Sequence, residues 1–128
     1  MHEHTKRAPK TSSAPTHTVF CNVKKEAGIK HDQEKIRTDL LPVRPIEEIC
    51  KVLTYGATKY KDRNWEQGLL YSRCYGAALR HLFSWWSGED NDKETKLSHL
   101  AHAGCCILFL LELMETHKEL DNRPKRRK

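Results

Sequence analysis

The stretch that decides the fold is AGCCILFLL, residues 103–111, in which every residue is apolar or a glycine. It lies inside a longer segment, residues 93–118, whose pattern predicts one long α-helix. A helix that is apolar on all sides lies in the middle of a helical bundle or in a subunit interface. The sequence therefore predicts an all-α protein built around this helix.

Two further segments carry a helical spacing of apolar residues. In residues 45–60 the apolar side chains recur every three or four positions, and Pro45 is placed to be the first residue of a helix. Residues 71–86 repeat the pattern and stop before Gly88, because glycine accepts the left-handed conformation that follows a helix end. Residues 61–68 between them are predicted to form a loop.

The long helix is predicted to begin with a capping box. Asn91 is followed three residues later by Glu94, and such a pair satisfies the free amide groups at a helix start. No segment alternates regularly enough to predict a strand. Because three helices make a small core for a monomer, we expect a small helical bundle completed by oligomerisation.

The chain has 128 residues and a formal net charge of +6, with the excess of basic residues at its two ends. We expect three parts: a disordered tail at residues 1–27, an all-α domain at residues 28–120 and a basic tail at residues 121–128. Since the central domain is about neutral, the basic ends argue only weakly for nucleic-acid binding.

Five cysteines are present, and Cys105 and Cys106 are adjacent in the apolar segment. Adjacent helical residues point in different directions, so we expect buried free thiols in a reducing compartment rather than a disulfide. The chain starts without a secretory signal pattern. Its apolar run is shorter than the roughly 20 residues that span a membrane. We therefore expect a soluble, cytoplasmic protein without a membrane partner.

A cluster of histidines and carboxylates stands out between the second and third predicted helices. His99 and His102 are three residues apart and would project from one helix face, where they are suited to metal binding or to acid–base chemistry. His102 lies between two alanines, so we expect it to be buried. Glu89 and Asp92 precede the helix, where they either cap it or hold a metal ion. His81 has a structural or hydrogen-bonding role as its simplest interpretation.

Other polar residues suit the binding of a nucleotide. Glu48 lies beside the apolar stripe of the first helix, where it either reaches a metal ion or pairs with Lys51 at the surface. The candidates for binding phosphate oxygens are Lys35, Arg37 and Arg80. The candidates for holding a base by stacking and hydrogen bonding are Tyr60, Asn64 and Trp65. An alternative for Trp65 is that it closes over the core.

Several motifs together resemble a domain common in bacteriophages. They are GxKxDxxKxRxDLLP from residue 28, YGAxKY from residue 55, RNWxxG from residue 63, ALRHL from residue 78, WW from residue 85, GEDxD from residue 88 and LSHLAH from residue 97. The chain resembles the dATP/dGTP diphosphohydrolase domain of the MazZ kind, allied to the MazG-like all-α nucleotide pyrophosphohydrolases. The likeness covers about residues 28–116.

The resemblance implies a helical oligomer that hydrolyses dATP or dGTP to the monophosphate and pyrophosphate with Mg²⁺ or Mn²⁺. The resemblance also implies a role for each candidate residue named above. The metal ligands would be Glu48, Glu89, Asp92 and His99; the catalytic residues Glu48, His99 and His102; the phosphate ligands Lys35, Arg37 and Arg80; the base pocket Tyr60, Asn64 and Trp65.

Two alternatives stay open beside this interpretation. MazG-like relatives carry an acidic cluster, Glu-Glu-x-x-Glu, and here Lys51 stands where its last acid belongs. A fixed ammonium group could replace a metal ion, so a catalytically inactive nucleotide-binding protein is one alternative. A nucleic-acid-associated protein that binds through the basic tail is the other, and its binding would weaken steeply with salt.

Overall fold

The computed structural model describes residues 28–126, so the predicted tail at residues 1–27 lies outside the described residues. The described chain divides into two parts after Ile36. In residues 28–36 the Lys35 amide donates to the Asp32 carbonyl (3.0 Å) and the Lys30 ammonium lies 3.9 Å from the Asp32 carboxylate. The second part contains all the helices and is described by itself below.

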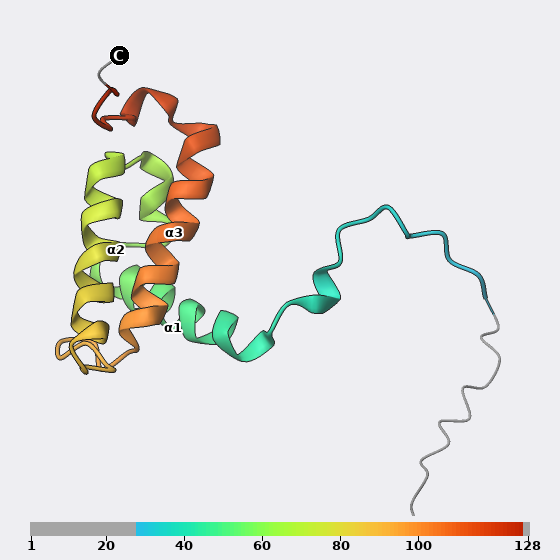
Figure 1. The fold of residues 1–128 in the computed structure, drawn as a ribbon, viewed down its shortest axis with the longest axis horizontal. Coiled ribbons are helices and arrows are strands. Elements are labelled where there is room, and N and C mark those ends of the chain that lie inside the picture. Colours follow the sequence, from blue (N-terminus) through green and yellow to red (C-terminus); the bar gives the residue numbers. More distant parts are fainter. Residues whose placement is uncertain (1–27, 127–128) are drawn as a thin grey trace, which may run out of the picture. The chain divides into compact units, whose positions relative to one another are not determined.

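The helical part consists of three α-helices and short 3-10 turns. Within residues 28–126 there is no strand beyond one isolated bridge between Asn91 and Ser98, which confirms the predicted all-α class. Helices α2 and α3 lie side by side and antiparallel (Figure 1). In chain order the elements are η1 (Thr38–Leu40), α1 (Val43–Lys59), η2 (Asn64–Gln67), α2 (Tyr71–Trp86), α3 (His99–Thr116) and η3 (Lys118–Leu120).

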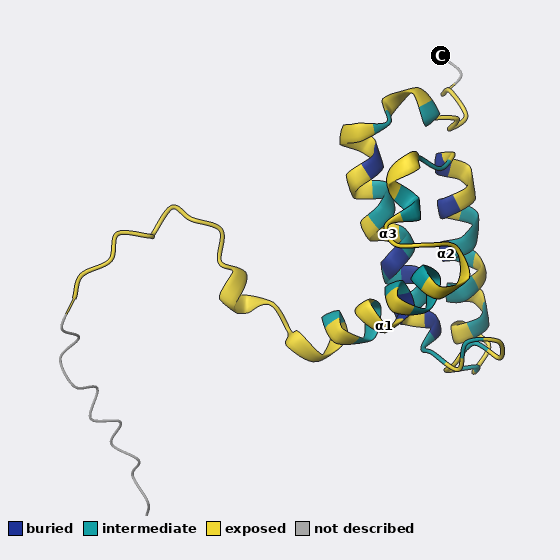
Figure 2. Ribbon diagram, turned by 180° about the vertical axis from the view of Figure 1, so that it is seen from behind, coloured by how far each residue is buried: buried dark blue, intermediate teal, exposed yellow. Residues whose placement is uncertain are grey.

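The core consists of two apolar clusters that meet at Phe109 on α3. One cluster joins α1 to α3 and the other joins α2 to α3, so the most buried positions lie where the helices face one another (Figure 2). The buried members are Val52, Ala101 and Cys105 in the first cluster, and Tyr71, Cys74 and Leu113 in the second. The central role predicted for the apolar helix is thus confirmed.

Helix α1 begins two residues earlier than predicted. Pro45 is the third residue of the helix, which starts at Val43 after Pro42. A proline is accepted there because the first amides of a helix have no carbonyl acceptor within the helix. The predicted end at residue 60 differs by one residue from the observed end at Lys59.

Helix α3 begins later than predicted, and the expected capping box is wrong. Lys96 has φ 61°, a left-handed conformation that a continuous helix from residue 93 does not allow. The cap is Ser98, whose side chain accepts the Leu100 amide. Asp92, rather than Asn91, binds the free amides ahead of the helix, those of Glu94 and Thr95.

The predicted loop at residues 61–68 contains the short helix η2, and His117 fastens it to the end of α3. The His117 Nε2 atom lies 2.8 Å from the Glu66 carbonyl oxygen, and its Nδ1 atom lies 2.8 Å from Glu119 Oε1. Gly68, with φ 96°, allows this close approach, because an added Cβ would lie 2.5 Å from the Leu120 side chain.

The outer side of α3 is apolar and uncovered by the rest of the described chain. Its exposed side chains are Leu100, Ile107, Leu108, Leu111 and Met114. Helix α3 also has the length and apolar composition of a membrane-crossing helix, a test that core helices of soluble proteins pass as well.

We expect the His117 contacts to stabilise the fold more at low pH. Both ring nitrogens face oxygen acceptors, so both bonds need the protonated ring, and the bond to Glu119 raises the His117 pKa above its usual value. This stabilisation is full below about pH 6.5 and is lost as the pH rises through the raised pKa. The melting temperature of His117→Ala should therefore fall further below wild type at about pH 6 than at about pH 9.

His31→Ala, in residues 28–36, is the matched control, because the His31 ring makes no hydrogen bond or ion pair with any described residue and its removal should leave the melting temperature unchanged. An equal effect of His117→Ala at both pH values would contradict the prediction.

Candidate functional site

An open cavity of about 930 Å³ lies among α1, the loop with η2, α2, α3 and the loop at residues 87–98. One wall is aromatic, with Tyr55, Tyr60 and Trp65. Trp65 stacks on Phe109 with ring centres 5.4 Å apart, so this wall rests on the core. Polar residues line the same cavity, among them Arg80, His81, Asp92 and His102.

The loop at residues 87–98 is shaped by Asp92. Its Oδ1 atom accepts the amides of Glu94 (3.0 Å) and Thr95 (2.9 Å), and its own amide donates to the Leu97 carbonyl (2.8 Å). The backbone bond to Thr95 is the main cause that lowers the Asp92 pKa, so the carboxylate is charged at neutral pH. The loop therefore holds one carboxylate in a fixed place beside the start of α3.

His99 is the buried histidine, with only 3% of its surface exposed. The prediction that His102 would be buried is wrong: His102 is half-buried and lines the cavity. The His99 side chain lies against α2, where its Nδ1 atom contacts His81, and this contact buries His99 instead. Its ring is fully partnered, as a buried imidazole requires.

A chain of hydrogen bonds links Glu89, His99 and His81. The His99 Nε2 atom lies 2.9 Å from Glu89 Oε1, and its Nδ1 atom lies 2.9 Å from His81 Nδ1. A carboxylate only accepts, so Nε2 of His99 carries the hydrogen. When His99 is neutral, its Nδ1 lone pair is therefore directed at His81. The bond to His99 is also the main cause that lowers the Glu89 pKa.

His102 packs against this chain from the cavity side. Its ring stacks on His81 with centres 4.4 Å apart and an angle of 9°, and its Nε2 atom lies 2.7 Å from Thr95 Oγ1. Burial is the main cause that lowers the pKa of both His81 and His102, so both rings favour the neutral form. Neutral imidazoles are available as metal ligands or proton acceptors.

Three of these residues form a group that can hold a metal ion. One potential ligand atom from each of His81, Asp92 and His99 lies within 4.8 Å of the other two. They come from three places in the chain: helix α2, the loop and the first turn of α3. Two imidazoles and one carboxylate are a set that divalent metal ions bind.

The structure brings most of the predicted site residues to one region. His102, Asp92, Arg80, Tyr60, Asn64 and Trp65 line the cavity, and Glu89 and His99 lie directly behind it. Arg80 forms no ion pair with any described residue, so its guanidinium is available to a ligand. Their assignment to metal, phosphate or base stays a prediction.

The remaining predicted residues are not among those that line the cavity. Glu48 pairs with Lys51 (2.7 Å) and is not among the residues that line the cavity. Arg37 is bound by Asp39 in a two-bond ion pair. Lys35 belongs to residues 28–36, which form a separate unit, and its amide donates to the Asp32 carbonyl there.

Sequence reasoning missed several residues of the site. The sequence predicts a structural or hydrogen-bonding role for His81 and no place in the metal group, although the ALRHL motif is a signal for this residue. Tyr55 and Lys59, four residues apart on α1, line the cavity and both bind Glu94 Oε1, at 3.2 Å and 3.3 Å. Their spacing puts them on one helix face, but only the fold shows that Glu94 lies opposite.

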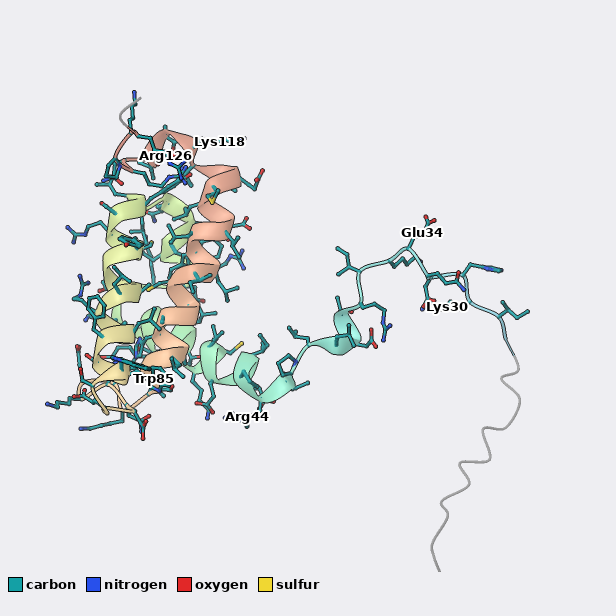
Figure 3. The ribbon with its side chains drawn as sticks, in the orientation of Figure 1. Lys30, Glu34, Arg44, Trp85, Lys118 and Arg126 are labelled. Carbon is teal, nitrogen blue, oxygen red and sulfur yellow. The ribbon has the colours of Figure 1, made fainter. Side chains whose placement is uncertain are left out.

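Lys118 and Arg126, two basic residues near the carboxyl end, lie away from the histidine–carboxylate group (Figure 3). Trp85 lies at the end of the α2–α3 pair where the loop joins the two helices, whereas Lys118 and Arg126 lie at the other end (Figure 3). The start of the predicted tail is held by Asn122, whose side chain bonds to the Ser72 amide and hydroxyl. The domain boundaries themselves stay predictions.

The fold and site define the chain as a small all-α protein with a histidine–carboxylate group beside an open cavity. A family model described as "dATP/dGTP diphosphohydrolase, N-terminal" matches residues 25–123. The chain therefore belongs to this family, and the resemblance inferred from its motifs is confirmed.

One similar curated protein is named "dATP/dGTP diphosphohydrolase" and comes from Salmonella phage PMBT28. It is 38% identical over 96 residues, which cover 75% of this chain but 33% of the relative. The chain thus spans about a third of the length of that relative. No solved structure matches the chain.

We expect the cavity thiols to be unreactive in the folded protein. Cys105 and Cys106 line the cavity, and burial raises their pKa to about 12 and about 11. A thiol reacts as its thiolate, so both should react with a disulfide reagent at about pH 8 only after unfolding. The exposed Cys50 should react at once.

The measurement is the rate of thiol release in a Cys21→Ser background, since Cys21 lies outside the described residues. Cys50→Ser should remove the fast phase. A fast phase that persists in this variant, in which only Cys74, Cys105 and Cys106 remain, and that disappears in Cys106→Ser would contradict the prediction.

Proposed function

We propose that the chain hydrolyses purine deoxynucleoside triphosphates, dATP or dGTP, to the monophosphate and pyrophosphate with the help of a divalent metal ion. The observation that carries the proposal is the cavity itself, which joins an aromatic wall to a histidine–carboxylate group in a member of this family. The curated relative has the corresponding name, and its remaining two thirds lie outside the match.

The aromatic side of the cavity suits a purine base. Trp65 is half-buried and fixed by its stack on Phe109, and the Arg63 guanidinium lies 5.5 Å from its ring centre. A base would stack on Trp65 if the Arg63 side chain moves aside. Asn64 offers both a donor and an acceptor for the edge of a base. Tyr60 is exposed at the rim of the same cavity.

The phosphates would lie between the aromatic wall and the histidines. Arg80 has no ion pair within the described chain and presents the forked donors that fit phosphate oxygens. Lys35 and Arg37 stay proposed phosphate ligands on the strength of their motif. Mg²⁺ or Mn²⁺, if bound, would neutralise the charge that develops on the phosphate oxygens.

In the proposed reaction a water molecule attacks the α-phosphorus, and the bond from that phosphorus to the pyrophosphate oxygen breaks. The water proton passes to a base, and pyrophosphate leaves with the bond electrons. His102 is the proposed base because it faces the cavity and favours the neutral form. Glu48 keeps its proposed catalytic role only if its pair with Lys51 opens.

The first test is product analysis with each ribo- and deoxynucleoside triphosphate, with and without Mg²⁺ or Mn²⁺. Monophosphate and pyrophosphate should appear from a purine deoxynucleotide only when metal is present. Arg80→Ala should lower kcat/KM about 10–100-fold, because that is the usual effect of removing a hydrogen bond to a charged group. Arg73→Ala, an exposed arginine on the same helix, should leave the rate unchanged.

His102→Gln should lower kcat about 100-fold or more, as the loss of a general base does, with little change in KM. Glu48→Gln decides whether that carboxylate takes part. Binding of nucleotide without any turnover would overturn the proposal in favour of the nucleotide-binding alternative.

We also propose that the chain forms a homo-oligomer through the outer side of α3. Its proposed location is the cytoplasm of the host cell, where nucleotides are used. The exposed apolar residues of α3, such as Ile107 and Leu111, support it, because a contiguous apolar stripe is costly in water. Its position on the far side of the core clusters leaves the cavity open.

We expect Leu111→Glu to convert the oligomer to a monomer, because a buried charge opposes association. Sedimentation or light scattering measures the mass, and Glu112→Gln, an exposed neighbour on the same helix, is the control. A wild-type chain that is already monomeric would contradict the proposal.

A further inference from the structure

The group formed by His81, Asp92 and His99 has features of a transition-metal site rather than of a magnesium site. His99 Nδ1 and His81 Nδ1 lie 2.9 Å apart. Two nitrogen ligands at ~2.1 Å from one ion, placed at a right angle, are ~3 Å apart. The ring nitrogens therefore already have nearly the separation of two ligands on a single ion.

The orientation of His99 also fits a metal ligand. Its Nε2 hydrogen is held by Glu89 Oε1, so its Nδ1 lone pair is directed at His81 Nδ1 and accepts the hydrogen of that nitrogen. An ion bound by both nitrogens would replace this hydrogen, and His81 would then carry its hydrogen on Nε2. A metal-binding histidine typically donates its other ring hydrogen to a carboxylate, and this second bond fixes the ring and makes it a stronger ligand. Glu89 is this carboxylate, because its Oε1 atom accepts the hydrogen of His99 Nε2.

The third ligand is Asp92, which the loop holds in place. Its Oδ1 is occupied by the amides of Glu94 and Thr95, so the carboxylate is anchored on one side and retains a second oxygen. His102 stacks on the His81 ring and restricts its rotation. The site is thus preformed from three separate segments by contacts that do not involve the ion.

We propose that His81, Asp92 and His99 bind a nitrogen-preferring first-row divalent ion, of the class of Co²⁺ or Zn²⁺, with Glu89 as the positioning residue behind His99. The affinity of imidazole ligands for divalent ions rises along the first-row series towards copper. Mg²⁺ instead prefers oxygen ligands. Two imidazoles and one carboxylate leave coordination positions open for water or substrate. The inference rests on this geometry and does not depend on the proposed reaction.

The test uses the full chain freed of metal by a chelator and titrated with Co²⁺ at neutral pH. Bound Co²⁺ gives a visible absorption band, and calorimetry with Co²⁺, Mn²⁺, Zn²⁺ and Mg²⁺ compares affinities. We expect one Co²⁺ per chain and much weaker binding of Mg²⁺. His81→Gln and Asp92→Asn should each lower the Co²⁺ affinity by about 100-fold or more, and Glu89→Gln by about 10–100-fold.

Two controls separate this site from adventitious binding. A variant with His2, His4 and His17 changed to alanine removes the histidines of the amino-terminal segment and should keep both the band and the affinity. His117→Ala removes a histidine outside the group and should do the same. The melting temperature of each metal-free variant shows whether a lost affinity reflects lost folding.

The outcomes decide the inference directly. Loss of the band in folded His81→Gln, with the band kept in both controls, supports the site. Unchanged Co²⁺ binding in His81→Gln, loss of binding in the amino-terminal variant, or Mg²⁺ bound as tightly as Co²⁺ would each overturn it. Hydrolysis supported by Mg²⁺ without Co²⁺ binding would overturn the inference alone, whereas Co²⁺ binding without hydrolysis would overturn the proposed function alone.

Discussion

The buried imidazole of His99 is the constraint on which the site depends. A ring this deep in the protein must have partners for its nitrogens, and it finds them on both sides, in Glu89 of the loop and His81 of α2. Those two bonds tie the loop and α2 to the first turn of α3. The same bonds direct the Nδ1 lone pair of His99 at His81. The hydrogen bonds that satisfy the buried ring therefore also bring two possible metal ligands close together.

The loop at residues 87–98 converts an antiparallel helix pair into a site. Asp92 accepts two amides of its own turn, and the left-handed Lys96 reverses the chain so that Ser98 can cap α3. This arrangement places the carboxylate of Asp92 beside two rings that belong to different helices. The shape of the loop, rather than the number of acidic residues in it, therefore decides which carboxylate meets the histidines.

Helix α3 has one side in the core and another side that is apolar and exposed. Its inner side joins both core clusters through Phe109, and the same residue supports Trp65 on the cavity wall. Its outer side stays apolar and exposed in the described chain, as Leu111 shows. Packing of the core, the cavity wall and a proposed subunit contact thus depend on one helix, which explains why so few of its residues are polar.

The sequence by itself determined the all-α class, the extent of α2, the family and most of the residues around the cavity, because apolar spacing and short motifs are local properties. The tertiary structure decided which histidine is buried, that His81 joins His99, and that Glu48 pairs with Lys51 away from the cavity. Residues 81 and 99 meet only because the loop reverses the chain between two packed helices. The start of α3 was misjudged for the same reason: the competing turn at Asp92 is stabilised by contacts that a helical spacing does not contain.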